Sequence, residues 1–209
     1  MRDDVKRMIE TGYDTMADRF AAWQSGIEGT TRIERMEELV ERLPARPDVL
    51  ELGVGAGVRS TRLLAERGRL TGVDISAEQL RRARERIPDA TLVHADFTEL
   101  ELDPESFDAV VAAYVLNHLP QEELQPLTRR IAAWLRAGGY FLGTFPTNDN
   151  PGWTGEWLGV EMFFAGFPPE ENRRLVELAG FEVLRDEIEI SIEPDGEARF
   201  QWLLARRPE

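Results

Sequence analysis

Three glycines alternate with other residues between an apolar segment and a predicted helix. Residues 49–52 are typical of a buried strand, Gly53, Gly55 and Gly57 follow, and a helix is predicted over residues 58–67. Glycines in such a turn allow positive φ and let the backbone approach a ligand closely. The free N–H groups at the start of the following helix can bind a polar ligand. The spacing therefore predicts a nucleotide-type cofactor site.

Two carboxylates follow the next two predicted strands. Asp74 ends a strand over residues 70–74, where an acid can accept hydrogen bonds from the two hydroxyls of a ribose. Capping of the next helix is its alternative role. Asp96 follows a strand over residues 91–93. It could accept from an adenine amino group while Phe97 packs on the ring, or it could simply cap a turn.

The glycine spacing helps to separate two classes of nucleotide-binding enzyme. A dinucleotide site places Gly or Ala three residues after the second glycine. That position here is Val58, whose bulk would crowd the helix that holds a pyrophosphate. The chain has no evident Tyr-x-x-x-Lys pair, and its only lysine is Lys6. Both observations count against a nicotinamide-dependent oxidoreductase of Rossmann type, which stays open as an alternative.

Strands and helices alternate around these residues. Beyond the strands already named, we predict a nearly all-apolar strand over residues 107–113 and another over residues 140–145. The helix between them contains Leu135 and is expected to stop at Gly138 and Gly139. Such alternation implies a parallel sheet with right-handed crossovers.

The C-terminal part departs from this alternation. A helix is predicted over residues 170–179, and two strands over residues 182–192 and 199–205 are joined by a hairpin signal at residues 194–196. The expected fold class is therefore α/β. It comprises a seven-stranded, mostly parallel sheet with helices on both faces, an antiparallel C-terminal hairpin and additional N-terminal helices.

In this order and spacing, the motifs resemble those of class I S-adenosylmethionine-dependent methyltransferases. Residues 51–57 match that family's glycine motif, Asp74 its ribose-binding acid and residues 95–97 its adenine motif. Residues 107–119 match its fourth strand and the exit from it, and residues 138–140 match the turn before its fifth strand.

The resemblance is strongest over residues 35–145 and implies a methyltransferase. Such an enzyme would transfer the methyl group of S-adenosylmethionine to a small-molecule acceptor by in-line displacement, which depends mainly on proximity and alignment. A non-catalytic S-adenosylmethionine-binding protein is a further alternative. The cofactor contacts that the resemblance implies are Tyr13, Glu51, Gly53, Gly55, Gly57, Asp74, Ile75, Asp96, Phe97 and Ala113.

The chain of 209 residues is expected to form a single domain with four parts. Residues 1–30, with a helix interrupted at Gly12, are similar to a segment that many of these enzymes fold over the cofactor. Residues 31–145 would form the cofactor-binding core, residues 146–168 an insertion that covers the substrate, and residues 169–209 the closing helix and hairpin.

His118, just past the fourth predicted strand, is the candidate general base, because histidine titrates near neutral pH. A base is needed only if the acceptor must lose a proton early. The alternative is that His118 is structural, and His94 is expected to be structural.

Aromatic side chains gather in residues 146–168, which show no clear periodicity. They are expected either to form a wall around the acceptor or to anchor this segment on the core. A pocket of this kind suits a flat or cationic molecule, and Glu156 and Glu161 favour an amine. The predicted substrate contacts are Trp153, Trp157, Phe163 and Phe164.

Composition excludes several function classes. The chain has no cysteine and two histidines, so neither disulfides nor a metal site are expected. A net charge of −14 argues against nucleic acid as a partner. There is no apolar run of ~18 residues and no apolar leader, so no membrane partner and a cytoplasmic location are expected. The sequence is compatible with a monomer or a homodimer.

Overall fold

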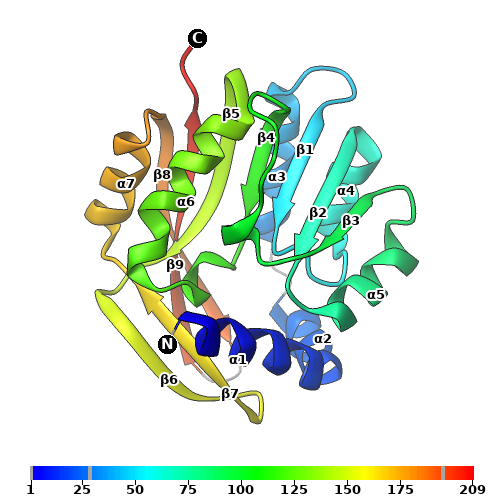
Figure 1. Cartoon of the computed structure of the whole chain (residues 1–209), viewed down its shortest axis with the longest axis vertical. Coiled ribbons are helices and arrows are strands. Elements are labelled where there is room, and N and C mark those ends of the chain that lie inside the picture. Colours follow the sequence, from blue (N-terminus) through cyan, green and yellow to red (C-terminus); the bar gives the residue numbers. More distant parts are fainter. Residues whose placement is uncertain (1, 28–29, 194–195) are drawn as a thin grey trace.

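The computed structural model describes residues 2–27, 30–193 and 196–209. Its main sheet has the strand order β3-β2-β1-β4-β5-β9-β8 (Figure 1). Strands β1 to β5 are parallel, and β9 is antiparallel to both of its neighbours. The bounds are β1 Asp48–Leu52, β2 Arg69–Asp74, β3 Thr91–His94, β4 Phe107–Ala112, β5 Leu135–Pro146, β8 Glu182–Glu193 and β9 Gly196–Arg206.

This architecture confirms the predicted fold class, including the antiparallel C-terminal hairpin. Two positions of the predicted hairpin turn, Pro194 and Asp195, lie outside the described residues. None of the helices in the described part of the chain is both long and apolar enough to cross a membrane.

Helices cover both faces of the main sheet. One face packs against α3 (Thr30–Arg42), α4 (Arg59–Arg67) and α5 (Ala77–Arg86), and the other against α6 (Gln121–Trp134) and α7 (Pro169–Leu178). The central strand β4 is buried from both sides, which explains its apolar sequence. Core side chains include Met36, Leu64 and Leu80 on the first face and Leu124, Ile131 and Val176 on the second.

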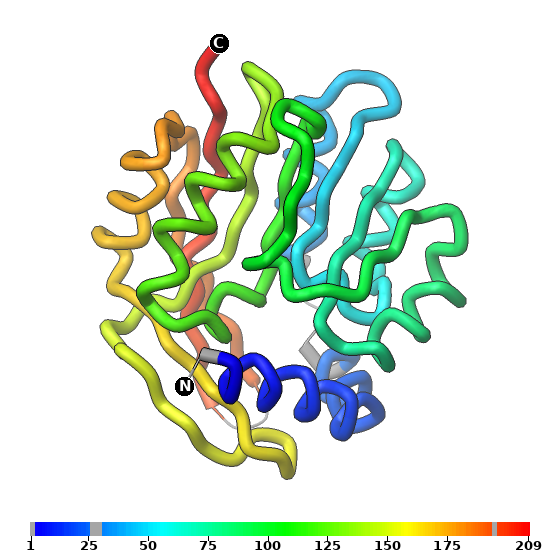
Figure 2. Tube along the Cα trace, viewed as in Figure 1, coloured from blue at the N-terminus to red at the C-terminus, as the bar shows by residue number. Residues whose placement is uncertain are grey.

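Two helices at the N-terminus lie across the carboxyl ends of the parallel strands (Figures 1 and 2). They are α1 (Arg2–Thr15) and α2 (Ala17–Ile27). The interruption predicted at Gly12 is wrong, because the break lies at Met16. Gly12 instead permits close approach to β7: a Cβ at this position would lie 2.3 Å from Sδ of Met162.

The segment predicted to lack periodicity forms a second, two-stranded antiparallel sheet. Strands β6 (Asn150–Trp157) and β7 (Val160–Gly166) are joined by Leu158 and Gly159, both at positive φ as a type I′ turn requires. A register shift between Asn150 and Trp153 disturbs the alternation of side chains, which is why the sequence pattern is weak. This hairpin packs on α1 (Figure 2).

One boundary in the core also differs from the prediction. Helix α6 ends at Trp134, and Leu135 is the first residue of β5, where it pairs with Phe107. Gly138 and Gly139 therefore lie within the strand and do not end the helix. The short turns η1 (Phe97–Glu99) and η2 (Leu116–His118) follow β3 and β4 at the carboxyl end of the sheet.

Candidate functional site

The glycine turn after β1 has the backbone that its sequence predicts. Gly53, Gly55 and Gly57 have φ of +68°, +56° and +67°, a region that disfavours other residues. Gly57 packs against α5, because a Cβ there would lie 3.3 Å from Cγ1 of Ile87. It does not line the cavity that opens in front of this turn.

Asp74, at the end of β2, is bonded to the glycine turn. Its Oδ2 accepts from the backbone N–H of Gly55 at 2.8 Å, and its Oδ1 accepts from the N–H of Ser76 at 2.9 Å. Ser76 caps α5 through its own hydroxyl, which accepts from the N–H of Gln79. Burial raises the pKa of Asp74 to about 6, although these N–H groups favour its charged form.

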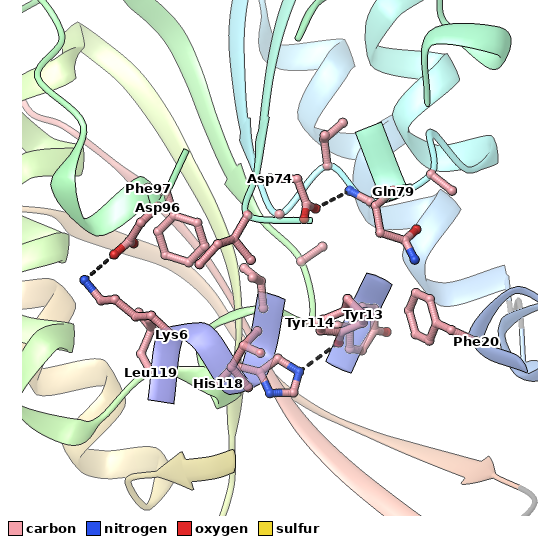
Figure 3. A pocket seen from close by; sticks show the side chains of 18 of the residues that line it. Lys6, Tyr13, Phe20, Asp74, Gln79, Asp96, Phe97, Tyr114, His118 and Leu119 are labelled. Carbon is pink, nitrogen blue, oxygen red and sulfur yellow. Dashed lines mark hydrogen bonds and ion pairs between the residues drawn. The ribbon is translucent and has the colours of Figure 1, made fainter. Parts of the chain in front are cut away.

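Asp96 joins the next strand end to the N-terminal helix. Its Oδ1 accepts from the N–H of Thr98 at 2.8 Å, which caps the turn η1. Its other oxygen forms an ion pair with Lys6 of α1 (Figure 3). Phe97, beside it, is buried. The sequence analysis missed Lys6, because nothing local connects it to a residue 90 positions away.

These residues enclose a cavity, which we name the front cavity. Nine of the residues predicted for the site line it: Tyr13, Gly53, Gly55, Asp74, Ile75, Asp96, Phe97, Ala113 and His118. Lys6, Arg32 and Gln79 line it as well and were not predicted. Figure 3 shows several of these side chains around the opening.

Glu51 does not line the front cavity, although it was predicted to contact the cofactor. It is fully buried in β1, where Oε1 accepts from the hydroxyl of Thr61 at 3.0 Å. A guanidinium nitrogen of Arg32 lies 3.7 Å from the same oxygen. Burial raises the pKa of Glu51 to about 7, and Arg32 opposes this shift. Glu51 thus anchors Arg32 at the cavity wall.

His118 bonds with both of its ring nitrogens. Nδ1 lies 2.9 Å from the carbonyl oxygen of Phe163, which can only accept, so Nδ1 carries the proton. Nε2 therefore accepts the hydrogen bond from the hydroxyl of Tyr13, at 2.8 Å (Figure 3). Burial lowers the pKa of His118 to about 4 and raises the pKa of Tyr13. His118 is thus neutral near pH 7 and faces Tyr13.

A second cavity adjoins the first, and we name it the aromatic cavity. The two cavities share six lining residues: Tyr13, Phe20, Gln24, Arg32, Tyr114 and His118. The remaining wall of the aromatic cavity is formed by Trp23, Ile33, Ser60, Asn117, Trp157, Phe164, Glu189, Ser191, Glu193 and Phe200.

The rings of the aromatic cavity pack on one another. Phe20 stacks on Trp23 with centroids 5.9 Å apart, and Trp23 meets Trp157 edge to face at 5.1 Å. Trp157 in turn meets Phe164 edge to face. Such contacts hold the rings in place before any ligand arrives.

Two of the four predicted substrate contacts line the aromatic cavity. Trp157 and Phe164 line the aromatic cavity, whereas Phe163 is 9% exposed and packs under α1. Trp153 is 53% exposed and stacks on Phe164, and it lines neither cavity. Phe163 still contributes through its carbonyl, which orients His118.

Glu156 and Glu161 do not face either cavity. They pair with each other across β6 and β7 and are exposed. Because side chains alternate along a strand, Glu156 points away from the face that carries Trp157. The argument for an amine from these two glutamates is therefore wrong.

The carboxylates that do line the aromatic cavity come from β8. The Oε2 of Glu189 accepts from the hydroxyl of Tyr114 at 2.6 Å and from Nε1 of Trp202 at 2.7 Å. Sequence analysis missed Glu189 and Glu193, because β8 alternates isoleucines with polar residues and either face could have been the buried one. His94 is exposed and its Nε2 donates to the carbonyl of Ile75.

Part of the chain is similar to known methyltransferases. Residues 49–139 match the methyltransferase domain family. The trans-aconitate 2-methyltransferase of Afipia carboxidovorans is 36% identical over 116 residues, 54% of this chain and 43% of that protein. The phosphatidylethanolamine N-methyltransferase of Cereibacter sphaeroides is 38% identical over 97 residues, 44% of this chain and 46% of that protein. The chain thus spans less than half the length of these two relatives.

Solved structures share the fold over more of the chain. A SAM-dependent methyltransferase of Methanosarcina mazei has a TM-score of 0.70 at 19% identity, covering 80% of this chain and 95% of that one. The 1,6-didemethyltoxoflavin-N1-methyltransferase of Burkholderia thailandensis, with bound 1,6-didemethyltoxoflavin and S-adenosylhomocysteine, has a TM-score of 0.62 at 22% identity, covering 97% and 91%. Residues 49–139 are thus similar to a methyltransferase domain, and the chain as a whole shares the fold of these S-adenosylmethionine-dependent methyltransferase structures.

Proposed function

We propose that this chain transfers the methyl group of S-adenosylmethionine to a small molecule held in the aromatic cavity. The observation that carries this proposal is that the two cavities share a wall, which includes Tyr13 and His118. A donor in the front cavity and a nucleophile in the aromatic cavity would meet at that wall. In-line displacement needs such an arrangement, because alignment supplies most of the rate enhancement.

The front cavity has groups that suit each part of the cofactor. Asp74 would accept from the ribose hydroxyls, since each of its oxygens keeps a lone pair beyond the one used by a backbone N–H. Phe97 and Asp96 would contact the adenine. Arg32 would face the carboxylate of the methionine portion. Glu51 and Gly57 would act indirectly, by anchoring Arg32 and by packing α5.

Tyr13 and His118 would together handle the proton of the acceptor. The cofactor, when bound, supplies an activated methyl group and a neutral leaving group. As the nucleophile forms its bond to the methyl carbon, its proton would pass to the oxygen of Tyr13, and the proton of Tyr13 would pass to Nε2 of His118. The carbonyl of Phe163 would stabilise the resulting imidazolium through Nδ1–H.

The two alternatives fit the site less well. Val58 lines the front cavity, so its bulk faces the space that a pyrophosphate would need in a nicotinamide enzyme. A non-catalytic binding protein would need no second cavity beside the cofactor, whereas the aromatic cavity shares six lining residues with the front cavity. The substrates named for the relatives differ from one another, so the acceptor cannot be carried over from them.

Calorimetry tests this proposal. We expect S-adenosylmethionine and S-adenosylhomocysteine to bind with one-to-one stoichiometry, and NADH and NADPH to give no saturable heat. Asp74→Ala should weaken S-adenosylhomocysteine binding at least tenfold, about 1.4 kcal/mol, because charge-assisted hydrogen bonds to the ribose are lost. The exposed Glu156→Ala is the control. Tight NADH binding without a response to S-adenosylhomocysteine would overturn the proposal.

A further inference from the structure

The wall that β8 contributes to the aromatic cavity is acidic. Glu189 and Glu193 line this cavity but not the front cavity, and Glu189 contacts the shared wall through Tyr114. Both donors to Glu189, from Tyr114 and Trp202, reach the same oxygen, Oε2. The other oxygen, Oε1, takes no hydrogen bond from the described part of the chain. Glu189 can therefore still accept from a ligand.

The described lining of the aromatic cavity carries few positive charges. Among the described residues that line the cavity, Arg32 is the only one with a permanent positive charge. Its guanidinium lies 3.7 Å from Glu51 and 5.5 Å from the ring centroid of Tyr114, so it already has partners of its own. His118 is neutral near pH 7 because burial lowers its pKa to about 4. A ligand that carries several negative charges would thus be repelled.

The rest of the wall suits a cation with an apolar body. Seven lining residues carry aromatic side chains: Tyr13, Phe20, Trp23, Tyr114, Trp157, Phe164 and Phe200. The faces of such rings attract organic cations. Because the rings already pack on one another, a ligand would not need to order them.

Three buried polar groups in this wall lack partners among the described residues. Ser60 is 2% exposed and lines the cavity, and its hydroxyl has no hydrogen-bond partner there. The same holds for the indole N–H of Trp23 and for the side-chain carbonyl oxygen of Asn117. Buried polar groups are normally satisfied. These three groups therefore favour an occupant that carries polar groups of its own.

From these observations we propose that the acceptor is an organic cation with two separate functional groups. Its positive nitrogen lies at Glu189 and Glu193, its aromatic or alkyl body lies among the rings, and its nucleophilic atom lies at Tyr13. This inference rests on the proposed methyl transfer for the identity of the site. The inference again favours a nitrogen-containing acceptor. Its basis is now the carboxylates of β8 and not those of β6 and β7.

The test uses a cation that cannot itself accept a methyl group. Benzyltrimethylammonium is titrated into the protein saturated with S-adenosylhomocysteine, and binding is followed by calorimetry and by the fluorescence of the tryptophans in the cavity. Phenylacetate and benzyl alcohol serve as anionic and neutral comparators. We expect the cation to bind at least tenfold more tightly than phenylacetate, a difference of about 1.4 kcal/mol.

Variants distinguish binding of the cation in the cavity from its nonspecific attraction to an acidic chain. Glu189→Gln and Glu193→Gln should each weaken the cation about tenfold and leave benzyl alcohol unchanged. Glu189→Gln keeps an oxygen acceptor for Tyr114 and Trp202. If Glu189→Gln nevertheless fails to fold, Glu193→Gln tests the same wall. Glu156→Gln removes the same charge from the exposed hairpin and is the matched control.

Three results would overturn the inference: phenylacetate binding as tightly as the cation, no saturable binding of the cation, or equal losses in Glu156→Gln and Glu189→Gln. A failure of the proposed function would look different. In that case S-adenosylhomocysteine itself would not bind in calorimetry, whatever the cation does.

Discussion

The hydroxyl of Tyr13 donates to Nε2 of His118 across 2.8 Å, and this bond joins α1 to the turn η2 after β4. Because Nδ1 of His118 donates to the carbonyl of Phe163, the same imidazole also connects the β6–β7 hairpin. Three segments far apart in the sequence thus meet at one ring, at the wall that both cavities share. His118 has no free nitrogen for a substrate, so any proton must reach it through Tyr13.

We expect Tyr13→Phe to lower kcat by about 10²-fold to 10⁴-fold, the usual contribution of a proton acceptor. The variant keeps the ring that packs on Phe20 but removes the oxygen through which the proton passes. The dissociation constant of S-adenosylhomocysteine should change less than twofold, since the hydroxyl is used by His118. Steady-state kinetics and calorimetry measure the two effects.

An acceptor whose nucleophile carries no proton is the control for this prediction. Tyr13→Phe and His118→Asn should both methylate it almost normally. If Tyr13→Phe retains full kcat with a proton-bearing acceptor, the pair serves to position α1 and takes no part in proton transfer.

Affinity for S-adenosylhomocysteine should fall as the pH drops through about 6. Burial raises the pKa of Asp74 to about 6, so protonation below this pH removes the charged acceptor for the ribose hydroxyls. Below that pKa each unit of pH should cost up to about tenfold in affinity. Calorimetry from about pH 5 to about pH 8 measures this.

Asp74→Asn isolates this effect from other titrating groups. Burial also raises the pKa of Glu51, to about 7, and that group remains in the variant. The fall in S-adenosylhomocysteine affinity near pH 6 should therefore disappear in Asp74→Asn, while any change in affinity near pH 7 persists. An unchanged pH profile in the variant would assign the fall to a different group.

Lys6→Met should loosen the cover of the front cavity. Lys6 forms an ion pair with Asp96 and donates to Thr98 at 2.8 Å, and both partners lie beyond β3. Without these bonds, α1 should open more often, so its amides should exchange hydrogen faster in the absence of ligand. Exchange followed by mass spectrometry tests this expectation. The exposed Arg7→Met removes the same charge from α1 and should leave exchange unchanged.

The core of the fold could be predicted from the sequence because its signals are local. The apolar runs of β1, β2 and β4, the glycines that follow β1 and the cap at Ser76 each lie within a few residues of the feature they produce. The sheet and most of the lining of the front cavity follow from these signals.

The lining of the aromatic cavity could not be predicted in the same way. Ile188 and Ile192 are exposed while Glu189 and Glu193 line a cavity, the reverse of the usual assignment for a strand with this alternation. The alternation of residues along β8 does not by itself determine which face of the strand is turned towards the cavity. The choice depends on β9, which pairs with β8 along its length, and on α2, which covers its inner face near Trp23.

Gly12→Val should destabilise the protein and disturb catalysis together. A Cβ at Gly12 would lie 2.3 Å from Sδ of Met162, which is fully buried, so we expect the added methyl groups to displace Met162 and to push α1 and β7 apart. Overpacking of this kind costs about 1–3 kcal/mol. The neighbouring residues are Tyr13 on α1 and Phe163 on β7, the two partners of His118, so separation of these elements should also lower kcat. Met162→Ala creates room at the same contact. In that background Gly12→Val should therefore cost less free energy of unfolding and should recover part of the lost kcat. Equal costs in both backgrounds, measured by chemical denaturation, would mean that the glycine is required for some reason other than this contact.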